Sequence, residues 1–234
     1  MIAPPDKTPD RIAGMFDAIA PRYDLLNHVL SAGIDRTWRA RAIRSLQLTG
    51  RETLLDVCTG TADVALHARD AARVIGVDFA AAMLSFGLRK VRAAAEAERI
   101  TLLRGDATRL PLRDGTVDVA TVAFGIRNVE RPELACAEMA RVMRRGGRLA
   151  ILEFGVPRVP GISTLYLWYF KYVLPTLGRL VSGHTAAYSY LPASVGTFPP
   201  PPAFMAMLEQ AGFTHVRADP LTFGIVYLYT AVRR

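Results

Sequence analysis

Short apolar runs alternate with amphipathic stretches through the middle of the chain. Five runs rich in valine, leucine, isoleucine and alanine predict strands at residues 53–57, 73–77, 100–104, 117–123 and 147–154. The stretches between them predict helices over residues 62–71, 80–95 and 131–144. Strands that alternate with helices indicate an α/β fold, in which a parallel sheet is covered on both faces.

The last of these helices has the clearest pattern. Ala135, Met139, Val142 and Met143 fall on one helical face, and Gly146-Gly147 predicts the end of the helix. Near the C-terminus, Pro199 to Pro202 predict a rigid turn before a helix that ends at Gly212. Two closing strands follow, at about 213–219 and 222–232. Because so short a connection joins them, they are predicted to pair antiparallel.

Two other regions depart from the alternation. Residues 10–48 predict short helices, at 12–16, 23–30 and 35–48. Residues 162–181 are apolar and aromatic, but Lys171, Pro175 and Arg179 interrupt them, which argues against a membrane-spanning helix. Two interpretations stay open for this segment: a core or cap helix, or a helix that lines a lipid groove or lies on a membrane surface.

Composition limits the function without deciding it. The chain has 234 residues, enough for one well-buried domain or one domain with a cap. The start, MIAPPDKTPDR, has no apolar stretch of the kind found in a signal peptide. Cys58 and Cys136 are far apart, which predicts no disulfide framework and fits a reducing, cytoplasmic compartment.

The net charge is +8, and only 3 of the 29 basic residues are lysine. Such a balance is compatible with nucleic acid, an anionic membrane surface, an acidic substrate, or simply a biased composition on a solvated surface. The basic residues are scattered and form no dense block with interleaved aromatic residues, so we expect no nucleic-acid partner.

The first strand leads into an unusual loop. Cys58-Thr59-Gly60-Thr61-Ala62-Asp63 has one glycine where a dinucleotide-binding loop needs three to approach a pyrophosphate. A ligand without phosphate relaxes this need, and S-adenosylmethionine (SAM) is such a ligand. Small residues at alternate positions, Cys58, Gly60 and Ala62, then suffice.

Acidic residues end the first strands. Asp56 ends the first strand, and Asp78 ends the second, where a carboxylate can accept both ribose hydroxyls. Asp106 follows the third strand and can meet an adenine amino group, with Ala107 leaving room for the ring. Each acid alone could be a helix cap. Three acids at three successive strand ends favour a cofactor site.

Four stretches of the chain resemble class I SAM-dependent methyltransferases, and more narrowly the quinone-ring C-methyltransferases of menaquinone and ubiquinone biosynthesis. They are MFDAIAPRYDLLNHVLSAGIDRTWR (15–39), DVCTGTAD (56–63), FGIRNVERPELACAEMARVMRRGGRLAILEF (124–154) and YSYLPASVGTFPPPPAFMAMLEQAGF (188–213). The resemblance implies a Rossmann-like sheet of seven strands, mostly parallel with an antiparallel last strand, plus N-terminal helices and a helical insertion near 160–198. It further implies one domain over 1–234: a helical cap at about 10–48, a SAM-binding core at about 50–155, substrate-side helices at about 160–212 and closing strands at about 213–232.

The resemblance also assigns the cofactor site. It implies SAM as cofactor and no metal, and its binding residues here are Asp56, Gly60, Thr61, Asp78, Met83, Asp106, Ala107 and Ala123. Two positions depart from the family pattern. Ala62 stands where the family loop has glycine, which adds a methyl group where we expect the cofactor to approach, and Ala123 lacks the hydroxyl that relatives commonly have.

The implied reaction moves a methyl group from the sulfonium sulfur to a ring carbon of a hydroquinol. The carbon becomes a nucleophile when a ring hydroxyl ionises, and a nearby cation favours that ionisation. Arg127 is the candidate cation, with Asn128 orienting the hydroxyl or a water. Asp24 or His184 could act as a base through water, and Tyr23 could close over the methyl group. The alternatives are a structural ion pair for Arg127 and core packing for Tyr23.

The expected partners follow from this reaction. A polyprenyl quinol needs an apolar channel, which residues 162–181 with Tyr188, Tyr190 and Phe198 could form. We therefore expect work at the inner face of a membrane, without a spanning helix, and a homodimer is compatible with the sequence. The rival hypotheses are methylation of another small phenol or lipid, methylation of nucleic acid, and a non-catalytic SAM-binding module.

Overall fold

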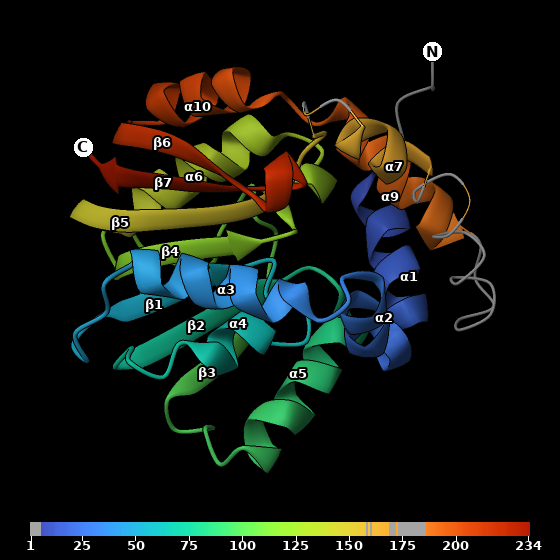
Figure 1. Ribbon diagram of the computed structural model, residues 1–234. Helices are drawn as coiled ribbons and strands as arrows, with labels where there is room; N and C mark the ends of the chain where they lie inside the picture. The colour runs from blue at the N-terminus through green and yellow to red at the C-terminus, as the bar shows by residue number, and fades with distance from the viewer. Residues whose placement is uncertain (1–5, 158, 160, 169–171, 173–185) are drawn as a thin grey trace.

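The computed structural model describes residues 6–157, 159, 161–168, 172 and 186–234. Seven strands form one sheet in the order β3-β2-β1-β4-β5-β7-β6 (Figure 1). They are β1 Thr53–Val57, β2 Arg73–Asp78, β3 Ile100–Arg104, β4 Val117–Ala123, β5 Met143–Phe154, β6 Phe213–Leu221 and β7 Val226–Arg233.

The first five strands pair in parallel, and β7 pairs antiparallel with both β5 and β6. The predicted fold is therefore confirmed, including its antiparallel closing strands. One boundary was wrong: β5 begins at Met143, four residues before the predicted strand. The four added residues include Gly146, whose φ is +77°. They lie where the pairing of β5 with β4 shifts register, between Val117 and Val119 of β4.

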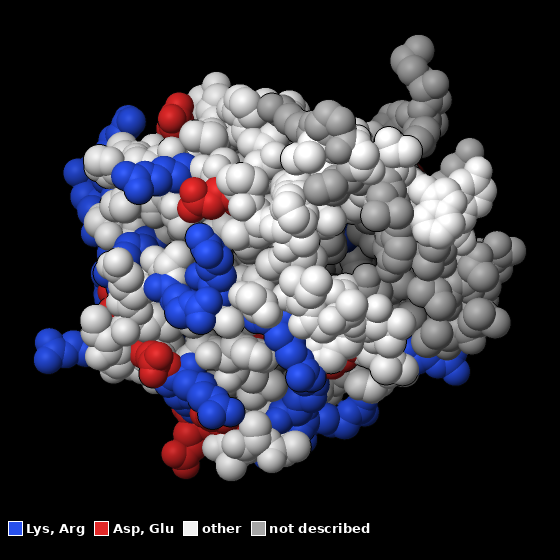
Figure 2. Space-filling view, in the orientation of Figure 1, with Lys and Arg blue, Asp and Glu red and all other residues white. Residues whose placement is uncertain are grey.

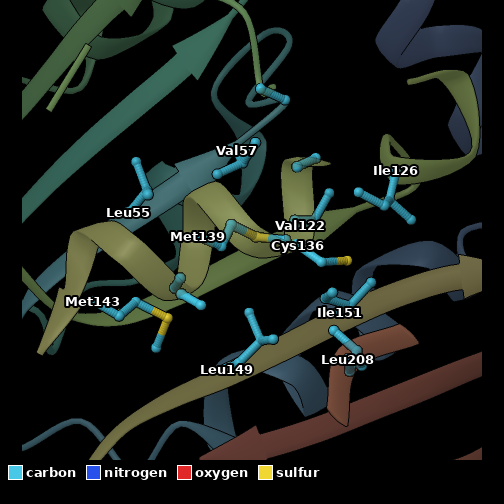
Figure 3. Close-up of a cluster of buried hydrophobic side chains, with 14 of the residues drawn as sticks. Leu55, Val57, Val122, Ile126, Cys136, Met139, Met143, Leu149, Ile151 and Leu208 are labelled. Carbon is cyan, nitrogen blue, oxygen red and sulfur yellow. The ribbon is translucent and has the colours of Figure 1, made fainter. Parts of the chain in front are cut away.

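Helices cover both faces of the sheet. On one face lie α3 Ile34–Ser45, α4 Asp63–His67 and α5 Ala81–Ala93, and on the other lie α6 Pro132–Val142 and α10 Pro201–Gln210. The predicted face of α6 is confirmed, because Ala135, Met139 and Val142 are fully buried. Figure 3 shows Met139 and Cys136 of α6 among side chains of β1, β4 and β5. This burial on both faces explains why the central strands are continuously apolar.

Two predicted helices were too long. The helix predicted at 62–71 spans Asp63–His67, because Ala62 is left-handed at φ +65° and Ala68 leaves the helical region at ψ +58°. The helix predicted at 131–144 ends at Val142, where the chain turns directly into β5. Both errors lie at ends that local conformation decides rather than periodicity.

A second group of helices lies beyond the carboxyl ends of the parallel strands (Figure 1). It contains α1 Pro9–Ile19, α2 Tyr23–Leu30, α7 Ile162–Trp168 and α9 Ala186–Thr197. Short 3-10 turns join the elements at Ala20–Arg22, Ile126–Asn128 and Thr222–Gly224. Within the described part of the chain, no helix has both the length and the hydropathy that crossing a membrane requires.

The predicted apolar channel is only partly within the described residues. Most of 169–181, His184 and the side chain of Tyr188 lie outside them. Phe198 is a core residue, since it packs on Phe204 with 4.9 Å between ring centroids and belongs to the cluster beneath α6 and α10. Its assignment to a substrate channel is therefore corrected.

Candidate active site

A cavity with an empty volume of about 1020 Å³ lies at the carboxyl ends of the parallel strands. This is where ligands bind in open α/β sheets. Its floor comes from the loops after β1, β2, β3 and β4. Its roof comes from the N-terminal helices, through Pro9, Ile12, Ala13 and Phe16 of α1 and Tyr23 of α2.

The loop after β1 forms one wall through an irregular backbone. Cys58, Gly60 and Ala62 all have positive φ, at +55°, +57° and +65°. Gly60 adopts this conformation freely, whereas Cys58 and Ala62 do so under strain. The methyl group of Ala62 is buried and faces Gly87 of α5, so closely that a Cβ added at Gly87 would lie 3.3 Å from it. This methyl group does not line the cavity, which corrects the expectation that it meets the cofactor.

Asp78 at the end of β2 fixes this loop. Its carboxylate accepts hydrogen bonds from the backbone N–H of Gly60 at 2.7 Å and of Ala80 at 2.9 Å. Burial raises the pKa of Asp78, and the hydrogen bonds from the two backbone donors limit this increase. Carboxylate oxygens have further lone pairs, and Asp78 lines the cavity. It can therefore hold the loop and accept ligand hydroxyls at the same time.

Other predicted cofactor residues line the same cavity. They are Gly60, Met83, Asp106, Ala107 and Ala123. Asp106 also accepts a hydrogen bond from the backbone N–H of Thr108 at 2.8 Å. A carboxylate and small residues from the strand ends thus surround one space together with a thioether from α5. This set fits a ribose, an adenine ring and an amino-acid chain, which are the parts of SAM.

Asp56 and Thr61 lie behind the loop rather than on the main cavity. Both line a smaller cavity next to Arg39. Thr59 Oγ1 donates to Asp56 Oδ2 at 2.6 Å, and burial raises the pKa of Asp56 to about 7 despite this bond. Thr61 Oγ1 donates to Asp24 Oδ1 at 2.5 Å. The structure therefore gives both residues a supporting position behind the predicted cofactor site.

A charged network joins the cap to the loop. Lys90 of α5 forms ion pairs with Asp24 of α2, at 2.8 Å, and with Asp63, the last residue of the loop. Asp63 also pairs with Arg39 of α3 at 2.6 Å. Asp24 was predicted as a base near the substrate. Here its carboxylate is engaged by Lys90 and Thr61, and it anchors α2 beneath the loop.

Two of the predicted catalytic residues line the main cavity. Tyr23 lies on its roof, edge-on to Phe16 with 6.0 Å between ring centroids, and burial raises its pKa. Asn128 lies opposite, after β4. Its Oδ1 is buried and has no hydrogen-bond partner among the described residues. A ligand group that donates a hydrogen bond would satisfy it.

Arg127 takes a different position. Its guanidinium forms an ion pair with Glu153 at 2.8 Å, and both side chains are buried. It also donates to the carbonyl of Phe124 and lies over the ring of Phe154, 5.2 Å from the centroid. Arg127 is not among the residues that line the cavity. The structure thus favours the ion-pair alternative, in which Glu153 neutralises most of the charge that Arg127 could direct toward the cavity.

Sequence reasoning missed three residues of this site. Lys7 lines the cavity from the segment before α1, Lys90 anchors the cap, and Glu153 neutralises Arg127. Glu153 lies in the stretch LAILEF, where a lone acid inside an apolar strand was the available signal. Lys7 and Lys90 gave no local signal, because their positions depend on how the N-terminal helices pack.

Comparison with known proteins identifies the family of the chain. A model of the ubiE/COQ5 methyltransferase family matches residues 6–233. The chain is 50% identical to the ubiquinone/menaquinone biosynthesis C-methyltransferase UbiE of Syntrophotalea carbinolica, over 94% of this chain and 92% of the relative. It is 45% identical to the demethylmenaquinone methyltransferase of Thermus thermophilus, over 94% of this chain and 100% of the relative.

Solved structures support the fold at low sequence identity. The [4+2]-cyclase SpnF has a TM-score of 0.67 at 18% identity, covering 97% of each chain. A SAM-dependent methyltransferase from Thermotoga maritima also has a TM-score of 0.67, at 16% identity, covering 95% of this chain and 100% of its own. Because SpnF is a cyclase, this structural similarity shows the fold but does not identify the reaction.

Proposed function

The chain belongs to the ubiE/COQ5 methyltransferase family, and from this we propose that it methylates a ring carbon of a polyprenyl hydroquinol. It is a SAM-dependent C-methyltransferase of menaquinone or ubiquinone biosynthesis. The proposed acceptor is demethylmenaquinol or the corresponding ubiquinol precursor. The alternative acceptor is another small phenol or lipid.

One observation carries the proposal. Asp78 and Asp106 line the same cavity as Tyr23 and Asn128. The first pair is suited to a nucleoside, and the second pair presents a phenol hydroxyl and a carboxamide beside it. A cofactor and a small aromatic ring can therefore meet within one enclosure, with α1 and α2 as its roof.

The protein's own groups position the reactants. SAM, when bound, supplies the methyl group from its sulfonium sulfur. Asp78 holds the loop through Gly60, and the Lys90 ion pairs hold α2 and thereby Tyr23 against that loop. The unpartnered Oδ1 of Asn128 can accept a hydrogen bond from a ring hydroxyl or a water. Orientation of this kind supplies much of the rate enhancement of group transfer.

A polyprenyl tail calls for an apolar surface next to this cavity, and α7 offers one. Trp168 is 52% exposed, and Val156 and Val159 just before the helix are 45% and 44% exposed. In Figure 2 the described atoms on this side are mostly uncharged, while most Lys and Arg lie on the opposite side and along the lower part of the view. Exposed apolar side chains of this kind support a proposed association with a membrane surface.

Vesicle sedimentation tests this part of the proposal. Trp168→Asp is expected to lower the bound fraction on vesicles of anionic and zwitterionic phospholipid, while a short-chain quinol in detergent is still methylated. Leu134→Asp is the control, because Leu134 is a 36% exposed residue of α6. Equal binding by both variants and the wild type would place the membrane contact elsewhere.

The activity is tested most simply in cells. A strain that lacks its own quinone-ring methyltransferase accumulates the demethylated quinone. Expression of this chain is expected to restore the methylated quinone, and quinone extraction followed by mass spectrometry identifies which ring is methylated. Restoration of neither quinone by a folded, SAM-binding protein would favour the alternative acceptor.

A further inference from the structure

Lys7 has an unusual position for a lysine. It precedes α1, is half-buried and lines the main cavity, with Asn128 and Asp78 on other walls. No hydrogen bond or ion pair joins its ammonium group to any described residue, whereas Lys90 is paired with two carboxylates. An ammonium that is partly removed from water without a counterion carries a free-energy cost, which an anionic ligand would relieve.

The Arg127–Glu153 ion pair influences both Lys7 and a residue of α9. Burial lowers the pKa of Lys7, the charge of Arg127 lowers it further, and Glu153 raises it in part. Arg127 and Glu153 also act on Tyr190 of α9, whose pKa burial raises to about 12. Among the described residues, the other charged groups that line the cavity with Lys7 are Asp78, Asp106, Glu130 and Arg131.

We propose that Lys7 is a catalytic residue whose ammonium group contacts the ring oxygen of the quinol that ionises before methyl transfer. The inference rests on the proposed function. An ammonium within about 4–6 Å of a phenol lowers the phenol pKa by roughly 1–3 units. Arg127 is not placed to make this contact, because it does not line the cavity and its guanidinium is paired with Glu153.

The chemistry balances with this assignment. The ring hydroxyl releases its proton to solvent, and Lys7 stabilises the anion that remains. The ring carbon then forms a bond to the methyl group as the sulfur–methyl bond breaks, and the electron pair of that bond stays on sulfur. Loss of the hydrogen from the same carbon as a proton restores the aromatic ring. No oxidant or reductant takes part in these steps.

The anion could also come from the cofactor, because SAM has a carboxylate. The two sources predict different measurements. If Lys7 contacts the quinol oxygen, Lys7→Met lowers kcat at saturating SAM by about 10²-fold at pH 7, and SAM affinity by calorimetry stays within about threefold. If Lys7 contacts the carboxylate, SAM affinity falls at least tenfold and kcat at saturating SAM is kept.

The pH profile and a charge-conserving variant sharpen the test. The deficit of Lys7→Met is expected to shrink as pH rises toward about 10, the pKa of a free phenol, since the ring then ionises unaided. Lys7→Arg keeps the charge and is expected to keep more than a tenth of the wild-type kcat at pH 7. Arg11→Met is the matched control, because Arg11 is a nearby cation with 69% side-chain exposure that pairs with Asp6.

A binding measurement that needs no turnover completes the experiment. The ionisation of bound 1-naphthol is followed by near-ultraviolet absorption in the presence of S-adenosylhomocysteine. Wild type and Arg11→Met are expected to lower the pKa of the bound naphthol by at least one unit relative to Lys7→Met. The inference is overturned if Lys7→Met matches the wild type in kcat and naphthol pKa, or if it loses only SAM affinity. A wild-type enzyme that methylates no quinol would instead overturn the proposed function.

Discussion

Arg127 and Glu153 form a buried ion pair at the carboxyl ends of β4 and β5, with Nη1 2.8 Å from Oε1. Glu153 Oε2 also accepts the backbone N–H of Arg127 at 3.1 Å, so the carboxylate holds both the side chain and the turn that carries Asn128. The pair connects the sheet core directly to the wall of the active site.

Removing one partner of this pair should destabilise the fold. Arg127→Ala leaves the Glu153 carboxylate buried without its counterion, and we expect the free energy of unfolding to fall by about 3–5 kcal/mol. The double variant Arg127→Met, Glu153→Leu should recover at least half of that loss in chemical denaturation. A single variant as stable as the wild type would contradict the structural role.

A neutral variant at the same position tests the electrostatic role that the sequence predicts for Arg127. If Arg127 acts only through the fold, the folded fraction of Arg127→Gln should keep a kcat within about threefold of the wild type. A loss of roughly 10²-fold at pH 7 that eases toward pH 9.5 would instead show that its charge favours the phenolate.

Asp78 should dominate cofactor affinity. Its carboxylate holds the Gly60 N–H and faces the cavity, so Asp78→Ala removes the loop support and the expected partner of the ribose. We expect calorimetry to show SAM binding at least tenfold weaker, which is the loss of one charge-assisted hydrogen bond. Asp114→Ala, in an exposed turn, is the control and should bind normally. Unchanged affinity in Asp78→Ala would remove the cofactor assignment.

Lys90 should hold the cap in place. Lys90→Met leaves Asp24 and Asp63 without their shared ammonium, and α2 loses its tie to the loop. We expect faster amide hydrogen exchange over Tyr23–Leu30 and weaker SAM binding by several-fold. Arg92→Met changes an exposed cation on the same helix and should alter neither measurement. Equal exchange in both variants would show that apolar contacts alone hold α2.

Asp56 should make stability depend on pH. Burial raises its pKa to about 7, compared with about 3.9 in the unfolded chain. Between these values the folded protein keeps a proton that the unfolded chain has released, so the free energy of unfolding of the cofactor-free protein should fall as pH rises from 4 to 7. The contribution of this group is at most about 4 kcal/mol. Asp56→Asn should make the free energy of unfolding less dependent on pH between pH 4 and 7. An unchanged dependence would show that other groups cause it.

Much of this architecture could be predicted from the sequence because burial on both faces makes the central strands continuously apolar. The same topology brings the residues after β1, β2 and β3 to one edge, which is why Asp78 and Asp106 could be placed together. The partners of Arg127 and Asp24 could not be predicted, because Glu153 and Lys90 are 26 and 66 residues away in the chain. Lys7 was missed for the same reason: its place on the cavity depends on the docking of α1.

We expect this enzyme to methylate the reduced ring. The most direct test incubates the purified protein with methyl-labelled SAM and short-chain demethylmenaquinone, with and without a reductant that converts the quinone fully to the quinol. Label is expected in the extracted quinone under reducing conditions and at least roughly 10²-fold less without them, because the oxidised ring has no hydroxyl to ionise. Equal labelling of the oxidised quinone, or no labelling of the quinol by a protein that binds SAM, would contradict it.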